Sequence, residues 1–208
     1  MQVTLINSPI NPDHLCGTAA AICTNSPDPI KALRGALKSG HESVAEHASF
    51  TFHIQDVSRV LLAQLTRHRI ASYSVESQRY CGIRPVWIVP QSIRDAGFEE
   101  AYLAQCTNAN NHFCTMISQG VPEEDARYVI PECVVCDLVF TANARALRHF
   151  FSLRMCNRAQ WEIRNLADEM HEICVACAPE LFRDSGCGCM TGKGCPEKKP
   201  CGHPRTKE

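Results

Sequence analysis

The chain has 208 residues, of which 45% are hydrophobic and 21% are charged, and its formal net charge is −1. This length fits one compact domain with or without a tail, the hydrophobic share excludes a disordered chain, and the near-neutral charge argues against strong nucleic-acid binding. No apolar run reaches the roughly 18 residues of a membrane span and no signal peptide is visible at the N-terminus, so we expect a cytoplasmic protein without a membrane partner.

The first part of the chain predicts two strands and a helix. Residues 3–6 alternate weakly between apolar and polar types. Asp28-Pro29 combines an N-cap with proline at the first helical position, which predicts a helix to about Lys38 that ends before Gly40. Residues 49–54 alternate more strictly and predict a half-buried strand.

The segment from His41 to His47 reads HESVAEH and suggests a zinc-binding helix at first sight. Its two histidines are six residues apart, whereas the metalloprotease helix places them four apart so that both face the same way. We therefore reject a zinc site of this type.

Residues 67–80 form an arginine-rich stretch that reads RHRIASYSVESQRY. The apolar stripe before it predicts a helix over residues 58–68, on which Gln64, Arg67 and His68 share a face, and the stretch then continues as a loop. Guanidinium groups fork onto phosphate oxygens and hydroxyl groups add short hydrogen bonds, which indicates a site for an anion or a nucleobase. A solvated basic turn is the alternative.

The region from residue 87 to residue 141 predicts a strand, a long helix, a short helix and a further strand. The short strand spans residues 87–90, and a helix over about 92–119, interrupted once, ends at Gly120. Pro122 begins a short acidic helix, and residues 133–141 are rich in β-branched and apolar types typical of a strand.

Residues 143–154 and 158–177 predict two more helices. One face of the first carries Asn143, Leu147, Phe150 and Arg154. Such an apolar stripe with polar ends suggests that the ends reach a ligand, while a helix with a snorkelling arginine is the alternative.

No linker and no internal repeat interrupts residues 1–184. We therefore expect a single α+β domain over this range, with a mixed or antiparallel sheet flanked by helices, followed by a flexible cysteine-rich tail over residues 185–208. The tail carries Cys187, Cys189, Cys195, Cys201 and His203, which could ligate zinc or an iron–sulfur cluster. Their spacings match no standard finger, so we favour a thiol-rich tail and predict no metal site. The scattered cysteines are expected to be small buried hydrophobic residues.

Residues 1–182 resemble the flavin-dependent thymidylate synthases. Four segments carry the resemblance: His41–His47, Arg67–Tyr80, Arg127 after its acidic run, and Asn143-Ala144-Arg145 with Leu153-Arg154 and Ala159-Gln160-Trp161-Glu162. The resemblance implies a methyltransferase that converts dUMP to dTMP with FAD as cofactor, methylenetetrahydrofolate as carbon donor and NADPH as reductant. It also implies a homotetramer with active sites at subunit interfaces.

The resemblance also implies the residues of the site. FAD would be held by Ser43, Arg67, His68, Arg69, Asn143, Ala144, Arg145 and His149. The substrate dUMP would be held by Gln64, Leu65, Thr66, Arg67, Val75, Glu76, Ser77, Gln78, Arg79, Arg127 and Arg154. We predict Arg154 as the catalytic residue, because a permanently charged guanidinium at the pyrimidine edge stabilises negative charge on N3 and O4 without proton transfer. Ser77 is interpreted as a ligand, since no base accompanies it as a nucleophile would require.

Two positions depart from the family pattern. Ser74-Val75 stand where the family commonly has Asn-Glu, so that Glu76 or a backbone group would have to replace the missing carboxylate. His149 stands where the family often has Asn, which makes the charge there sensitive to pH.

A second hypothesis assigns the chain to a different class of protein. It is a cysteine-rich metal-binding module that contacts nucleic acid through the arginine-rich loop. The near-neutral charge and the confinement of clustered cysteines to the tail argue against it.

Overall fold

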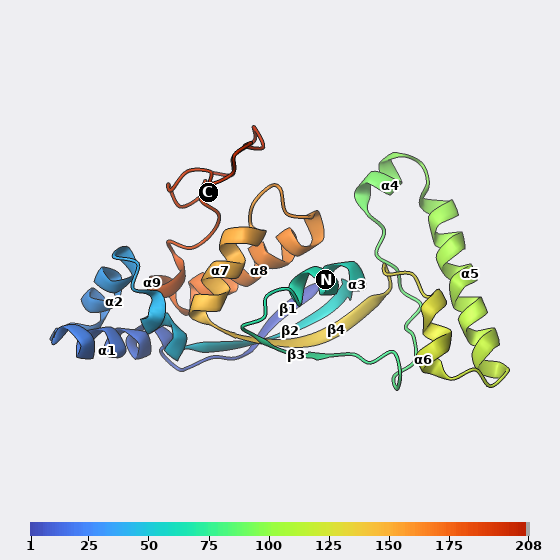
Figure 1. Cartoon of the computed structure of the whole chain (residues 1–208), viewed down its shortest axis with the longest axis horizontal. Helices are drawn as coiled ribbons and strands as arrows, with labels where there is room; N and C mark the ends of the chain where they lie inside the picture. The colour runs from blue at the N-terminus through green and yellow to red at the C-terminus, as the bar shows by residue number, and fades with distance from the viewer. Residues whose placement is uncertain (207–208) are drawn as a thin grey trace. The chain divides into compact units, whose positions relative to one another are not determined.

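The computed structural model describes residues 1–206 and has an α+β fold built on one four-stranded antiparallel sheet (Figure 1). Across the sheet lie, in this order, β1 (Gln2–Asn7), β2 (Ser49–Ser58), β4 (Val135–Asn143) and β3 (Ser72–Val75). The predicted α+β class is confirmed. The strand expected at 133–141 is shifted two residues toward the C-terminus, and β3 was missed because the arginine-rich stretch was interpreted as a loop.

The chain packs as two compact units that both contribute residues to β2 and β4. The first unit comprises Met1–Gln2, Ile54–Thr66 and Ser74–Leu138. The second comprises Val3–His53, Arg67–Tyr73 and the chain from Val139 onward. The arginine-rich stretch is therefore divided between the units.

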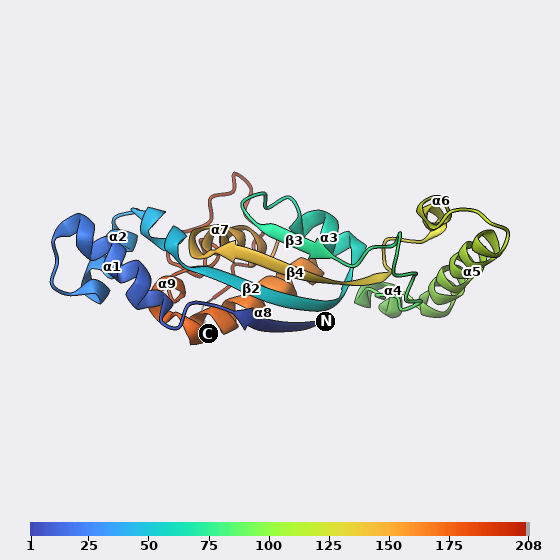
Figure 2. The same cartoon turned by 90° about the horizontal axis from the view of Figure 1, so that it is seen from below.

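The second unit carries most of the core. Its helices are α1 (Pro12–Thr24), α2 (Pro29–Lys38), the 3-10 helix η1 (Glu42–His47), α7 (Ala144–Arg154), α8 (Trp161–Cys177) and α9 (Pro179–Phe182). Helices α7 and α8 lie on the same face of the strands, as Figures 1 and 2 show from two sides. Phe50, Phe52 and Phe140 point to this covered face and are buried, whereas their neighbours Thr51 and Thr141 remain partly exposed. The predicted alternation in β2 is confirmed.

Two helices of this unit begin with the same local signal. The Asp28 side chain caps α2 by accepting a hydrogen bond from the Lys31 amide at 3.0 Å, and Asn11 caps α1 by accepting one from the His14 amide at 3.1 Å. Each cap is followed by proline at the first helical position. This signal predicted α2, whereas α1, which carries the same signal, and the short helix α9 were not predicted.

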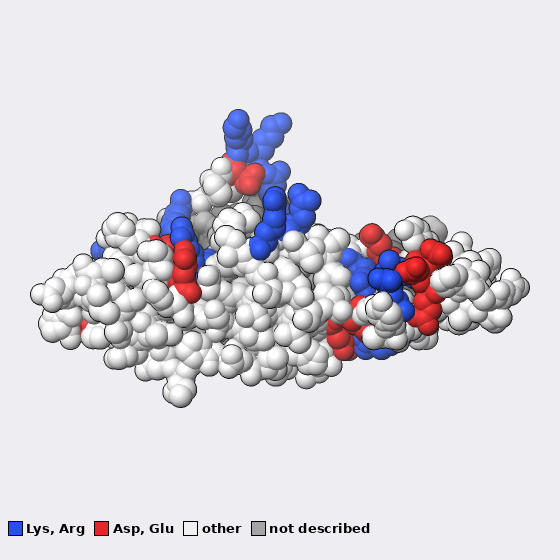
Figure 3. All heavy atoms as spheres, turned by 60° about the horizontal axis from the view of Figure 1, so that its bottom comes forward, with Lys and Arg blue, Asp and Glu red and all other residues white. Residues whose placement is uncertain are grey.

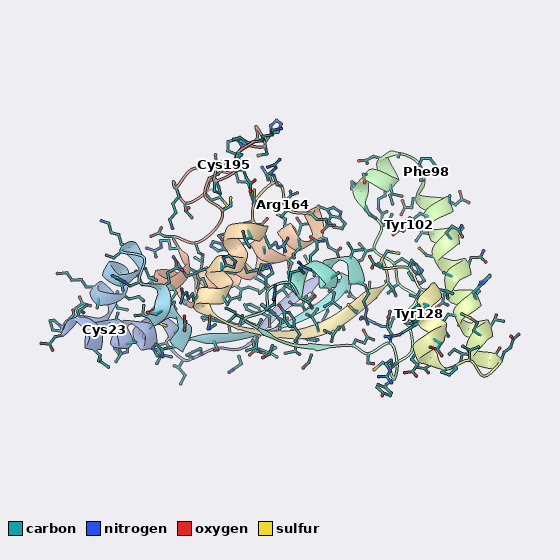
Figure 4. All side chains as sticks on the ribbon, in the orientation of Figure 1. Cys23, Phe98, Tyr102, Tyr128, Arg164 and Cys195 are labelled. Carbon is teal, nitrogen blue, oxygen red and sulfur yellow. The ribbon has the colours of Figure 1, made fainter. Side chains whose placement is uncertain are left out.

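The first unit holds α3 (Arg59–Leu65), α4 (Gln91–Asp95), α5 (Glu99–Ser118), α6 (Glu123–Ala126) and the 3-10 helix η2 (Arg127–Val129). The expected interruption of the long helix occurs between α4 and α5, where Gly97 takes a positive φ of 75°. The Tyr102 hydroxyl, on α5 in Figure 4, donates to the carbonyl of Ile88 at 3.0 Å. The strand expected over residues 87–90 is wrong, since this segment makes only a single bridge from Trp87 to Val134.

Ion pairs join distant segments of the first unit. The Arg84 guanidinium contacts the carboxylates of Asp56, Glu76 and Asp137 at 3.1, 3.2 and 2.6 Å. Figure 3 shows acidic and basic side chains intermixed at the right of the view, in the region of α6. Burial raises the pKa of Asp137, but hydrogen bonds from the Asp56 amide and from Arg84 outweigh it, so the pKa of this carboxyl lies below its usual value.

The cysteine-rich tail makes specific contacts with other parts of the second unit. Arg205 donates to the Asp168 carboxylate at 2.7 and 2.9 Å, and Arg158 pairs with Glu197 at 3.2 Å. Cys187 is buried, while Cys195, labelled in Figure 4, is exposed. Within residues 1–206, no helix combines the length and the apolar character needed to cross a membrane.

Candidate functional site

A cavity of about 700 Å³ in the second unit lies at the residues that follow α3, at α7 and at η1. It is lined by Glu42, Glu46, Arg67, His68, Arg69, Ile70, Asn143, Arg145, Ala146, His149, Leu153 and Arg154. Six of the predicted flavin ligands and the predicted catalytic arginine are in this set. The structure thus brings the predicted residues Arg67 and Arg154, which are 87 positions apart in the chain, to one cavity.

Helix α7 positions both polar ends of its apolar stripe at this cavity. The Asn143 side chain caps the helix by accepting a hydrogen bond from the Ala146 amide at 2.9 Å. Leu147 and Phe150 are buried in the core and hold the helix in place. Asn143 and Arg154, at opposite ends of the stripe, both line the cavity.

The catalytic candidate is held by an imidazole. Arg154 Nε donates a hydrogen bond to His68 Nε2 at 3.0 Å. Burial lowers the pKa of His68 to about 4, with further lowering by the positive charge of Arg154 and by His149. His68 is therefore neutral near pH 7, and because Nε2 accepts, its proton lies on Nδ1.

The helix expected to carry His68 ends earlier than predicted. Helix α3 stops at Leu65, so Arg67 and His68 lie beyond it and do not share a helical face with Gln64. His68 is held instead by tertiary contacts. Its carbonyl accepts a hydrogen bond from the Tyr73 hydroxyl at 2.7 Å, and its ring meets Phe150 edge-on with 4.9 Å between centroids.

The cavity carries a net positive charge. Its lining includes four arginines and only two glutamates. Both glutamates are held in ion pairs, Glu46 with Arg145 at 2.5 Å and Glu42 with Arg148 at 3.2 Å. The lining thus holds more guanidinium groups than carboxylates even though Arg145 is itself paired with Glu46, and this excess favours an anionic ligand such as a phosphate ester.

Two predicted flavin ligands, Ser43 and Ala144, are not among the lining residues. Several lining residues were not predicted: Glu42, Glu46, Ile70, Ala146 and Leu153. The spacing of Ala146, His149 and Leu153 along α7 is the three-and-four rhythm of one helical face, so this part could have been found from the position of Arg154. The glutamates lie in the same short segment as Ser43.

Most of the predicted dUMP ligands belong to the first unit, whereas Arg67 and Arg154 line the cavity of the second. In the first unit Glu124 gathers two of them: its carboxylate pairs with Arg79 at 2.7 Å, and its carbonyl accepts from Arg127 Nε at 3.1 Å. The Arg79 amide also donates to the Ser77 hydroxyl at 3.2 Å. Two guanidinium groups and a hydroxyl form a set suited to a phosphate.

Other predicted dUMP ligands of the first unit have structural contacts. The Glu76 carboxylate accepts from the Asp137 amide and from Arg84, both at 3.2 Å. The Leu65 side chain is fully buried, so a ligand contact there would have to come from its backbone. The Thr66 hydroxyl donates to the Leu62 carbonyl at 3.0 Å. The first unit also holds Gln64, Val75 and Gln78.

The cysteines show no arrangement for metal binding. Among residues 1–206, no three His, Cys, Asp or Glu side chains are grouped so that they could hold a metal ion. All fourteen cysteines are free thiols. Cys16, Cys106, Cys136 and Cys174 are buried as expected for the scattered cysteines, but Cys23, Cys81 and Cys114 are exposed, which corrects that expectation.

Comparisons with known proteins place the chain among its relatives. Residues 4–180 match the family described as thymidylate synthase complementing protein. The chain is 42% identical to a flavin-dependent thymidylate synthase of Geobacter sulfurreducens and 38% identical to one of Clostridium tetani, in both cases over 95% of this chain and 91% of the relative. It is 41% identical to one of Pyrococcus horikoshii over 78% of this chain and 71% of that protein. The family match includes every cavity-lining residue and ends before the cysteine-rich tail.

Proposed function

The chain belongs to the family of flavin-dependent thymidylate synthases, and from this premise we propose that it converts dUMP to dTMP by reductive methylation. The observation that carries the proposal is the cationic cavity in which Arg154, at the end of α7, lies beside the Arg67–Arg69 segment. Three separate parts of the chain converge there on chemistry that suits a phosphate-bearing ligand and a polarised pyrimidine.

The lining residues fit FAD by their chemistry. A volume of about 700 Å³ lies in the range of cofactor pockets, and its arginines suit a pyrophosphate. We assign FAD to Ser43, Arg67, His68, Arg69, Asn143, Ala144, Arg145 and His149. When bound, the flavin supplies the hydride and one-carbon transfer chemistry that amino-acid side chains lack. The protein contributes binding, orientation and charge.

Arg154 is assigned the catalytic role on dUMP. Its guanidinium stays protonated in a partly buried site, although burial lowers its pKa. A fixed positive charge at the pyrimidine edge stabilises negative charge that develops on N3 and O4, which makes C5 nucleophilic. Ser77, Arg79 and Arg127 are assigned to the phosphate of dUMP, with Gln64, Leu65, Thr66, Arg67, Val75, Glu76 and Gln78 as further contacts.

The family resemblance supports the remaining parts of the proposal. They are methylenetetrahydrofolate as carbon donor, NADPH as reductant, a homotetramer with active sites at subunit interfaces, and a cytoplasmic location. Residues 1–184 form the catalytic domain in this proposal, and residues 185–208 are an appended tail.

The visible absorption spectrum of the purified protein, with and without dUMP, tests the proposal. We expect oxidised-flavin bands that shift when dUMP is added, and dTMP formation when folate and NADPH are present. A protein that binds no flavin after FAD is supplied, or that binds flavin and forms no dTMP, would contradict it. A protein without flavin that retains metal and binds nucleic acid would support the alternative, a metal-binding module.

A further inference from the structure

We propose that His68 acts as a positioning residue for Arg154, restraining the guanidinium group through the hydrogen bond from Arg154 Nε to His68 Nε2. This inference rests on the proposed function and deepens it. The resemblance assigns His68 to the flavin only. The structure gives the same side chain a second task, which is exerted on the catalytic arginine.

The hydrogen bond restricts the side-chain torsion angles of Arg154, which are the most variable part of an arginine. Arg154 is the last residue of α7, and its side chain has several rotatable bonds whose ordering costs about 2 kcal/mol. A bond to Nε at 3.0 Å restrains the position of this nitrogen and the direction of its N–H. A charge oriented before the substrate binds requires no reorganisation during the reaction.

The acceptor is itself held rigidly. Tyr73 donates to the carbonyl of His68 at 2.7 Å, and burial raises the pKa of Tyr73 to about 12, so its hydroxyl remains a donor. The Tyr73 ring packs on Phe140, with 5.3 Å between centroids. The His68 ring packs edge-on against Phe150, one turn before Arg154 on the same helix. The donor Arg154 and the acceptor His68 are thus both held by residues of the same core.

The charge state of His68 suits this task. Burial, Arg154 and His149 lower its pKa to about 4, which keeps the imidazole neutral and its Nε2 free of a proton near pH 7. A protonated His68 would present donors on both nitrogens and could not accept from Arg154. It would also place two positive charges side by side. The arrangement therefore requires the Nδ1–H tautomer.

Nitrogen NMR of the flavin-free protein tests the geometry apart from catalysis. With ¹⁵N-labelled histidine, we expect His68 in the Nδ1–H tautomer at neutral pH. Arg154→Ala should weaken this preference, while the Arg158→Ala control, which removes a surface arginine paired with Glu197, should not. An Nε2–H tautomer in the unaltered protein would overturn the inference.

Kinetics at saturating FAD test the consequence. Gln can place a neutral acceptor near the position of Nε2, whereas Leu cannot. We expect His68→Leu to lower kcat about 100-fold, the cost of misplacing a catalytic group by roughly 1 Å, and His68→Gln to restore most of the loss. His149→Gln is the control for effects on flavin binding. It removes the other imidazole of the cavity, whose ring centroid lies 6.3 Å from that of His68. Equal losses of kcat in His68→Gln and His68→Leu would contradict the inference.

A double-mutant cycle separates positioning of Arg154 from a general effect. In an Arg154→Ala background, His68→Leu should cause no further loss of kcat, since the group that it positions is gone. Additive losses would contradict the inference. If the unaltered protein binds flavin and forms no dTMP, the proposed function fails, whereas the tautomer measurement still decides the geometry.

Discussion

Two arginines, one in each compact unit, show how the partner of a guanidinium decides its use. Arg84 in the first unit is bound by the carboxylates of Asp56, Glu76 and Asp137. Burial lowers its pKa, but these acids outweigh the burial and raise it. Arg154 in the second unit donates to a neutral imidazole, and burial lowers its pKa. The carboxylates neutralise Arg84, whereas the imidazole orients Arg154 and leaves its charge uncompensated by that bond.

A cationic side chain near a site is therefore not by itself a ligand. Arg84, whose charge is compensated by three acids, joins β2, β4 and the residue after β3. A neutral acceptor such as the imidazole of His68 orients a guanidinium without neutralising it. Substitutions of Arg84 and Arg154 should therefore separate effects on stability from effects on activity.

The largest expected effect is on turnover. Arg154→Ala should lower dTMP formation about 10³-fold while the fold survives, because it removes the charge that stabilises the activated uracil. Turnover at saturating substrates measures dTMP formation, and far-ultraviolet circular dichroism measures whether the fold survives. Arg158→Ala, a surface arginine just beyond α7, is the matched control. Near-normal turnover of Arg154→Ala would remove the catalytic assignment.

The next effect concerns pH. The pKa of His68 is about 4 in the folded protein and about 6.5 in the unfolded chain. Between these values the unfolded chain binds the proton and the folded protein does not, so stability is lost as the pH falls from about 6.5 to about 4. The loss is at most about 3 kcal/mol.

Urea unfolding of the flavin-free protein at several pH values measures this loss. His68→Gln, which cannot titrate, should lose less stability than the unaltered protein over the same range. Parallel pH profiles for the two proteins would show that His68 is already able to take up a proton when folded.

A smaller effect is expected for the carboxylate-bound arginine. Arg84→Ala should lower the free energy of unfolding by about 1–2 kcal/mol, because three partly exposed carboxylates lose their common partner. The affinity for FAD, which we propose binds in the cavity of the second unit, serves as the control measurement and should change little. A loss of FAD affinity without a loss of stability would contradict the structural role of Arg84.

The smallest effect concerns the exposed pair of Arg79 and Glu124, in which about half of each side chain is accessible. Glu124→Gln should change the free energy of unfolding by less than about 1 kcal/mol. It should also tighten dUMP binding about 2- to 5-fold, since the carboxylate no longer competes with the substrate phosphate. Titration of the flavin spectrum with dUMP measures the affinity. Weaker binding would show that Glu124 orients Arg79 instead.

Local chemistry along the sequence determined most of the regular elements. The Asp28-Pro29 cap predicted α2, the alternation around Phe50 and Phe52 predicted β2, and the stripe from Asn143 to Arg154 predicted α7. These signals depend on residues within a few positions of each other. The α1 cap shows that more of the same information was present.

Tertiary packing decided what the arginine-rich stretch became. The sequence predicted a helix through His68 and then a loop, but α3 ends at Leu65 and β3 forms at Ser72–Val75. Pairing with β4 and packing of Tyr73 on Phe140 supply that strand, and both partners are more than 60 residues away in the chain.

The residue types of the candidate site follow from the motifs in the sequence. Which of these residues are in contact depends on the fold: Arg154 contacts His68, 86 residues away in the chain, and Arg79 contacts Glu124. The charge state of His68 was likewise undetermined, since its pKa depends on burial and on the charge of Arg154. Desolvation and Coulomb interactions act through space, and no spacing along the chain encodes them.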